Sequence, residues 1–286
     1  MNASLRLARG PRLLLCLLAL TLASACASQP PPVVVRKPSA PRPARADRQT
    51  EKLTDLMTSV GLNWLLLMKP QEVLQLPWLA EPLGRILRDD RLTLLARATG
   101  IDLRTATTLA LARYEGEVTA FAIRHPQDQL SIERKFRERL TRSPTRRIEG
   151  HQLVHASGLL GRRKLAFAAI GRDVALFQYG GDLARGPARL ATLYARGKLV
   201  SIPRALQDRS VKLTAAQLSP APLTLILRGP FEDKMVRGAR GLLGAALAVG
   251  LTLRTTKDKG FILDLVLLGD YSSEDNPNAA ADLLLH

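Results

Sequence analysis

Residues 108–123 read TLALARYEGEVTAFAI, and this stretch decides the fold class. Its two apolar runs, 108–114 and 118–123, flank Glu115-Gly116-Glu117, and a short glycine-containing segment between two such runs is a hairpin signal. Runs at 164–170 and 174–179 repeat the arrangement around a turn at 171–173. Strands joined by short turns must pair antiparallel, so the middle of the chain predicts an antiparallel sheet.

Segments with helical periodicity alternate with these strands. Ile132, Phe136 and Leu140 recur on one stripe of a predicted helix at 131–140. The other predicted helices are 53–60, 78–87, 90–99, 183–199, 231–243 and one that begins at Asn276. Gly100 is expected to end the helix at 90–99, Asp102 to cap one more turn, and Gly186-Pro187 to delay the start of the helix at 183–199. The other predicted strands are 64–68, 147–157, 223–228, 247–253 and 261–268. No regular structure is predicted for 201–221. The fold class is therefore α+β, with antiparallel sheet covered by helices, and two β-α-β-β-α lobes are an alternative interpretation.

The N-terminus has the layout of a secretion signal. Arg6, Arg9 and Arg12 precede an apolar run of 13 residues, 13–25. A membrane-spanning helix needs about 20 apolar residues, so a cleaved signal peptide at 1–25 is the better interpretation.

The end of that segment, Leu22-Ala23-Ser24-Ala25-Cys26, resembles the lipobox of bacterial lipoproteins. The resemblance implies cleavage before Cys26 and attachment of diacylglycerol, with fatty acyl chains such as palmitate, to its thiol. The family prefers leucine three places before the cysteine, where this chain has Ala23. The same residues also fit the A-x-A site of ordinary signal peptidase, which would give a soluble secreted protein. The resemblance covers about the first 28 residues and implies nothing about the function of the rest.

The segment that follows predicts a tether and a location. Residues 26–46 contain six prolines and four Lys/Arg residues, which predicts a semi-extended, positively charged linker. Ala27 and Ser28 lack the aspartate linked with inner-membrane retention in enteric bacteria, so we expect a lipid-anchored protein of the outer membrane. Residues 47–286 form the predicted globular domain, with a sub-division expected near 201–221. After signal removal Cys26 would be the one cysteine left, so no internal disulfide is expected.

Positive charge is concentrated in one segment. The formal net charge is +17, and residues 132–164 hold ten Lys/Arg against three acids. We expect these ten residues to form an anion-binding patch: Arg134, Lys135, Arg137, Arg139, Arg142, Arg146, Arg147, Arg162, Arg163 and Lys164. For an exported protein the expected partners are anionic lipid, glycan or acidic protein, and not nucleic acid. A solvated surface without any ligand is the alternative.

No catalytic or metal site is legible. Glu149, His151 and His155 would share a face if 147–157 were one strand. The two histidines would then lie about 13 Å apart, too far for one metal ion, so we expect no metal, no cofactor and solvent-facing histidines. Ser157 precedes Gly158 near His155, but that pair predicts a turn and not a nucleophile.

These observations favour a non-catalytic envelope lipoprotein with a binding or assembly role. Two alternatives stay open. One is an envelope enzyme whose site assembles from distant residues such as Glu149, His151 and Asp173, which would show as a concave pocket with a perturbed acid or histidine. The other is a purely architectural subunit of an envelope complex.

Overall fold

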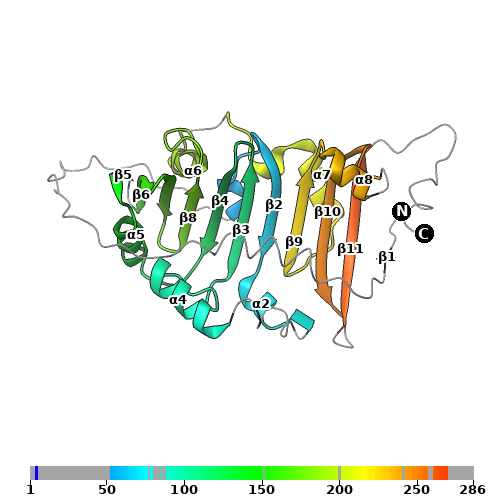
Figure 1. Cartoon of the computed structure of the whole chain (residues 1–286), viewed down its shortest axis with the longest axis horizontal. Helices are drawn as coiled ribbons and strands as arrows, with labels where there is room; N and C mark the ends of the chain where they lie inside the picture. The colour runs from blue at the N-terminus through cyan, green and yellow to red at the C-terminus, as the bar shows by residue number, and fades with distance from the viewer. Residues whose placement is uncertain are drawn as a thin grey trace.

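The computed structural model is an α+β fold built on one antiparallel sheet (Figure 1). It describes residues 4–5, 52–76, 78–79, 85, 88–150, 152–198, 201–239, 242–256 and 260–269. The strand order is β1-β11-β10-β9-β2-β3-β4-β8-β7-β6-β5. The strands are β1 Ser4–Leu5, β2 Leu62–Met68, β3 Thr108–Tyr114, β4 Val118–Arg124, β5 Arg142–Gly150, β6 Leu153–Leu160, β7 Arg163–Ile170, β8 Val174–Tyr179, β9 Leu223–Arg228, β10 Ala246–Thr255 and β11 Phe261–Gly269.

Strand β2 joins the two ends of the sheet. In the Cα register its Leu65 pairs with Ala112 of β3 on one side and with Ile226 of β9 on the other. Strands that precede and follow residues 201–221 are therefore parts of the same sheet.

Helices cover the sheet, as the sequence predicted, and they lie on both of its faces. The helical segments are η1 Leu53–Leu56, α2 Pro70–Leu74, α4 Asp89–Thr99, α5 Gln129–Glu138, α6 Pro187–Ala195, η2 Ala205–Gln207, α7 Arg209–Gln217 and α8 Asp233–Gly238. Segments η1, α6, η2 and α7 pack on one face, and α5 and α2 pack on the other. None of the helices in the described part of the chain is long and apolar enough to cross a membrane.

The two faces of the central strands differ in side-chain size. Alternate residues of a strand point to opposite faces. The face under α6 carries buried alanines, namely Ala110, Ala112, Ala120, Ala122, Ala166 and Ala168. The opposite face carries Phe167 and Phe177, whose ring centroids lie 5.1 Å apart, and Phe136 of α5 packs against both. The alanine face lets α6 approach through its own Ala188 and Ala191.

Gln178 of β8 fixes the start of α6. Its fully buried side chain accepts a hydrogen bond through Oε1 from Ala188 N at 3.0 Å, and Nε2 donates to Gly180 O at 2.9 Å. A Cβ atom at Gly186 would lie 2.2 Å from the same Nε2, so glycine is required there by the close approach. The amide thus ties the sheet to the first turn of α6.

Several local predictions are confirmed. The hairpin around Gly116 joins β3 and β4 at the expected residues. Gly100 ends α4 in the left-handed conformation with φ 83°, and Pro187 stands in the first turn of α6.

The predicted strand at 147–157 is wrong, because the chain turns back within it. Strand β5 ends at Gly150 and β6 begins at Leu153, with Gln152 at φ 59° in the turn. Strand β6 then continues through Gly158, which was predicted to be a turn. A Cβ atom at Gly158 would lie 2.9 Å from Leu140 Cδ1, so this glycine serves close packing under the chain that leaves α5.

Other differences concern helices. Residues 201–221 contain η2 and α7, and the Asp208 side chain caps α7 by accepting from Ser210 N and Val211 N. The predicted helix at 53–60 is the short η1, and α8 ends at Gly238 well before residue 243. The predicted helix at 78–87 lies largely, and the one from Asn276 wholly, outside the described residues.

We expect Gln178→Ala to lower the free energy of unfolding by about 2 kcal/mol, because it removes buried hydrogen bonds and leaves their backbone partners unsatisfied. Urea unfolding followed by circular dichroism measures the change. Gln217→Ala, at an exposed position of α7, is the matched control and should stay within about 0.5 kcal/mol of the wild type. Equal effects of the two substitutions would contradict this role of Gln178.

Candidate functional site

The chain that leaves α5 lies against the far end of β6. Thr141 N donates to Leu159 O at 2.7 Å, and Gly161 N donates to Thr141 Oγ1 at 3.0 Å. In the Cα register Leu159 pairs with Arg142 of β5 on one side and with Lys164 of β7 on the other. This arrangement gathers five cations at one corner of the sheet, which we call the basic corner: Arg139, Arg142, Arg162, Arg163 and Lys164.

Four of the five cations of the basic corner are exposed to solvent, and Arg139 is half-buried. Residues 142–148 and 161–164 are exposed. Within the described ranges, no carboxylate forms an ion pair with Arg139, Arg142, Arg162 or Lys164. Uncompensated cations in one place raise the local positive potential and attract anions. The basic corner is therefore the candidate functional site.

Other members of the predicted patch are used inside the fold. Glu133 of α5, whose side chain is 4% exposed, forms ion pairs with Arg146 of β5 at 2.5 Å and with Arg137 at 3.5 Å. Arg134 lies 4.0 Å from a carboxylate one turn further along α5, and Lys135 donates to a backbone carbonyl in α4. Arg146 and Lys135 thus connect α5 to β5 and α4, whereas Arg134 and Arg137 pair within α5.

The pleat of β5 divides what the sequence predicted as one patch. Arg146 reaches α5 on one face, whereas Arg147 pairs in register with His155 on the α6 face. Neighbouring residues in a strand point to opposite faces, so ten cations close in sequence cannot share one surface. The prediction of a single ten-residue patch was wrong in this respect.

Glu149 forms a buried ion-pair cluster on the α6 face. Its carboxylate oxygens accept from Arg189 of α6 and from Arg196, the residue that follows α6, and the Glu149 side chain is 8% exposed. Burial opposes ionisation of Glu149, but the hydrogen bonds and charges of Arg189 and Arg196 outweigh it and hold the pKa of Glu149 below its ordinary value. The cluster fastens the β5–β6 hairpin to α6.

His155 lies beside this cluster and is buried, not solvent-facing as predicted. The residue is 4% exposed, and its Nε2 has no hydrogen-bond partner in the described part of the chain. Burial, with the positive charge of Arg189 beside it, lowers the pKa of His155 to about 4. The imidazole is thus neutral at neutral pH. Among the described residues no three His, Cys, Asp or Glu side chains are placed to hold a metal ion.

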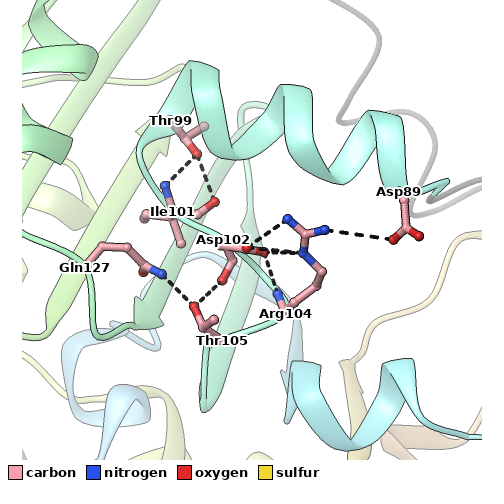
Figure 2. A network of polar contacts seen from close by, with 7 residues as sticks. All are labelled: Asp89, Thr99, Ile101, Asp102, Arg104, Thr105 and Gln127. Carbon is pink, nitrogen blue, oxygen red and sulfur yellow. Dashed lines mark hydrogen bonds and ion pairs between the residues drawn. The ribbon is translucent and has the colours of Figure 1, made fainter.

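A second buried histidine, His125, was missed by the sequence analysis. It is 2% exposed in the loop between β4 and α5, and burial lowers its pKa. The loop is braced from both sides. Gln127 Nε2 donates to Thr105 Oγ1 at 2.6 Å within the network that Figure 2 shows, and Gln129 Nε2 donates to Val174 O at 2.8 Å. The sequence His-Pro-Gln-Asp directly before a predicted helix was the available signal for an ordered loop here, because Asp128 caps α5.

Figure 2 shows how the rest of that network supports the loop. Asp102 accepts two hydrogen bonds from the Arg104 guanidinium at 2.9 Å, and Thr105 Oγ1 donates to Asp102 O at 2.9 Å. The hydrogen bond from Arg104 outweighs the cost of burial and lowers the pKa of Asp102. Asp102 was predicted to start a helical turn, and it instead closes a turn that braces α4 against the β4–α5 loop.

The residues proposed for an enzyme site do not converge. Asp173 forms an ion pair with Arg124 at 3.1 Å, and no contact in the described chain joins it to Glu149. His151 lies outside the described residues. A pocket of about 190 Å³ lies between the η1–β2 loop, the β3–β4 turn and the start of α6, and neither Glu149 nor His155 lines it. Its volume is below the range of about 300–1,000 Å³ usual for ligand sites.

We expect His155 to make the protein sensitive to mild acid. The unfolded chain binds a proton on this histidine near pH 6.5, whereas the folded chain binds it only near pH 4. Stability is therefore full above pH 6.5 and falls between 6.5 and 4, by up to about 1.4 kcal/mol per pH unit. His155→Leu should flatten the dependence of the urea midpoint on pH across this window. Parallel curves for the two proteins would contradict the assignment.

Comparison with known proteins gives no family. No family model matches the chain, and no curated protein matches it. Among solved structures, crystal form IV of TP0453 aligns with 9% identity over 74% of this chain and 78% of that chain, at a TM-score of 0.45. Crystal form I of TP0453 aligns with 9% identity over 79% of this chain and 81% of that chain, at a TM-score of 0.44.

Proposed function

We propose that this chain is a lipoprotein of the bacterial outer membrane that binds an anionic, phosphate-bearing envelope component at its basic corner and catalyses no reaction. The observation that carries the proposal is the group of exposed Arg142, Arg162 and Lys164 with the half-buried Arg139, which no carboxylate of the described residues neutralises. The membrane attachment in this proposal is inferred from the lipobox-like sequence that ends at Cys26.

The chemistry of the corner favours phosphate groups on a surface. A guanidinium offers paired N–H donors that match two phosphate oxygens, and three of the four uncompensated cations are arginines. Each Lys or Arg close to an anionic membrane surface contributes about 1 kcal/mol, so four such groups suffice for salt-sensitive binding. Lipid head groups and lipopolysaccharide phosphates have this chemistry.

The tether brings the corner within reach of a membrane. Residues 26–46, if semi-extended at about 3.1 Å per residue, allow the domain to lie up to about 60 Å from the lipid on Cys26. A lipid anchor also raises the effective concentration of the corner near the head groups, so weak individual contacts add to a stable association.

A non-catalytic role agrees with the ion pairs that three acidic side chains form. Glu149 is bound by two arginines, Glu133 by two others, and Asp173 by Arg124. These three carboxylates are thus engaged in ion pairs with arginine side chains.

We expect Arg142→Ala/Arg162→Ala/Lys164→Ala to weaken binding to anionic vesicles at least tenfold at 0.1 M salt, because it removes three uncompensated charges. Co-sedimentation with phosphatidylglycerol-containing vesicles measures the affinity. The control Arg97→Ala/Lys212→Ala/Lys234→Ala removes three exposed cations elsewhere and should retain most of the binding. Equal loss in both variants, or equal binding to neutral vesicles at every salt concentration, would overturn the proposal.

The anchor has a separate test. Intact mass of the protein purified from membranes should show a chain that begins at residue 26 and carries a diacylglyceryl group, and Cys26→Ser should release the protein from the membrane fraction. A chain found with a free Cys26 thiol would refute the anchor and leave the vesicle experiment to decide the basic corner alone.

A further inference from the structure

The two outer strands of the sheet differ in how well they are protected against pairing with another strand. Edge strands present unpaired N–H and C=O groups, and proteins block them with charges, prolines and bulges. Strand β5 has all three, because Pro144 lies within it, its exposed Arg142 and Arg147 carry charge, and Ser143 at φ 50° marks an irregularity in the register with β6. This edge is closed to strand addition.

Strand β11, next to the two-residue β1 at the opposite end of the strand order, is less protected: it has no proline, and its register with β10 shifts only near one end, between Ala246 and Ala248. Residues 261–269 read FILDLVLLG, nine residues without Lys, Arg or Pro. The single charge, Asp264, is neutralised by Arg254 of β10 at 3.0 Å. The Arg254 hydrogen bond, against the cost of burial, holds the pKa of Asp264 below its ordinary range, so this pair persists at neutral pH.

The outer edge of β11 accepts an extended segment in the structure. In the described chain its one partner there is β1, where Ser4 pairs with Asp264 and Leu5 with Leu263, antiparallel. Both β1 residues lie in the predicted signal peptide. Within the described part of the chain, removal of the signal would leave the outer backbone groups of this long apolar strand without a partner, a state that water-soluble proteins avoid.

We propose that β11 pairs with β11 of a second copy, antiparallel across a two-fold axis, to make one continuous sheet through a dimer. An antiparallel strand pair is compatible with a two-fold axis, so the same edge can serve both copies. Full overlap of 261–269 places Leu265 opposite its own copy and Leu263 opposite Leu267.

The distribution of charge favours a second copy at this edge. The chain carries +17, which opposes self-association through most of its surface. Strand β11 is neutral once Asp264 is paired, whereas the basic corner lies at the other end of the strand order. Nine strand spacings of about 4.8 Å put the β5 edge about 40 Å from β11. Pairing through β11 therefore places the two basic corners at opposite ends of the dimer, where their repulsion is screened.

Sedimentation equilibrium of the detergent-solubilised chain, purified from membranes with its mass recorded, tests the proposal. We expect a dimer, and Leu265→Lys should raise its dissociation constant at least 100-fold, because a charge is placed on the pairing edge. Ile148→Lys, the same change at a 57% exposed position of the β5 edge, should leave the dimer unchanged. Thermal unfolding by circular dichroism establishes that both variants are folded.

A second measurement fixes the register. In the processed chain, which lacks Cys16 and whose Cys26 thiol carries the lipid, Leu265→Cys should give a disulfide-linked dimer on mild oxidation, and Thr145→Cys on β5 should not. A monomer at 100-fold the concentration used for vesicle binding would overturn the proposal. So would a dimer that Leu265→Lys leaves intact, or capture of another protein's strand by a chain that stays monomeric. None of these outcomes bears on the basic corner, whose vesicle binding is measured separately.

Discussion

The close approach of α6 to an alanine-covered sheet is the constraint on which much of this structure depends. The alternation of strand residues places alanines on one face and phenylalanines on the other. A helix that meets alanine at both surfaces lies nearer to the strands than one that meets larger side chains. Gln178 then fixes the start of that helix through buried hydrogen bonds. The positions of Arg189 and Arg196 follow from this docking, and with them the buried carboxylate of Glu149.

Ion pairing divides the cations of the chain into two groups. Those that meet buried carboxylates, such as Arg146 at Glu133 and Arg189 at Glu149, connect elements and have little left to offer a ligand. Four cations of the basic corner, Arg139, Arg142, Arg162 and Lys164, have no such partner among the described residues. Buried ion pairs are costly to break because a charge is then left uncompensated in the interior. The distinction between structural and available cations is thus an energetic one, and it directs the functional proposal to the corner.

The sheet is asymmetric from edge to edge. One edge is charged, contains a proline and is irregular in register, and β11 near the other edge is mostly apolar and contains no proline. A domain attached to a membrane by its N-terminal lipid, with a cationic corner at one end of its sheet and a pairing edge at the other, would combine surface binding with self-association. The proposed dimer would also carry two lipids and two corners, and bivalent attachment is stronger than either contact alone.

Much of the fold could be predicted from the sequence because its signals are local. The β3–β4 hairpin, the stop of α4 at Gly100 and the start of α6 at Pro187 depend on residues within a few positions of one another. The turn within 147–157 could not be predicted, because Gln152 gives no glycine-type signal for its positive φ. Helix α7 was missed although Asp208 is a good N-cap residue.

The sequence by itself determined the signal-like N-terminus, the α+β class and the positive segment at 132–164, because each depends on residues close together in the chain. The tertiary structure alone decided which of those positive charges are available. Glu149 meets Arg189 and Arg196 across 40 and 47 positions, and Glu133 meets Arg146 across a helix and a loop. Compensation of charge depends on strand register and helix docking, and these are set by packing between segments far apart in the chain.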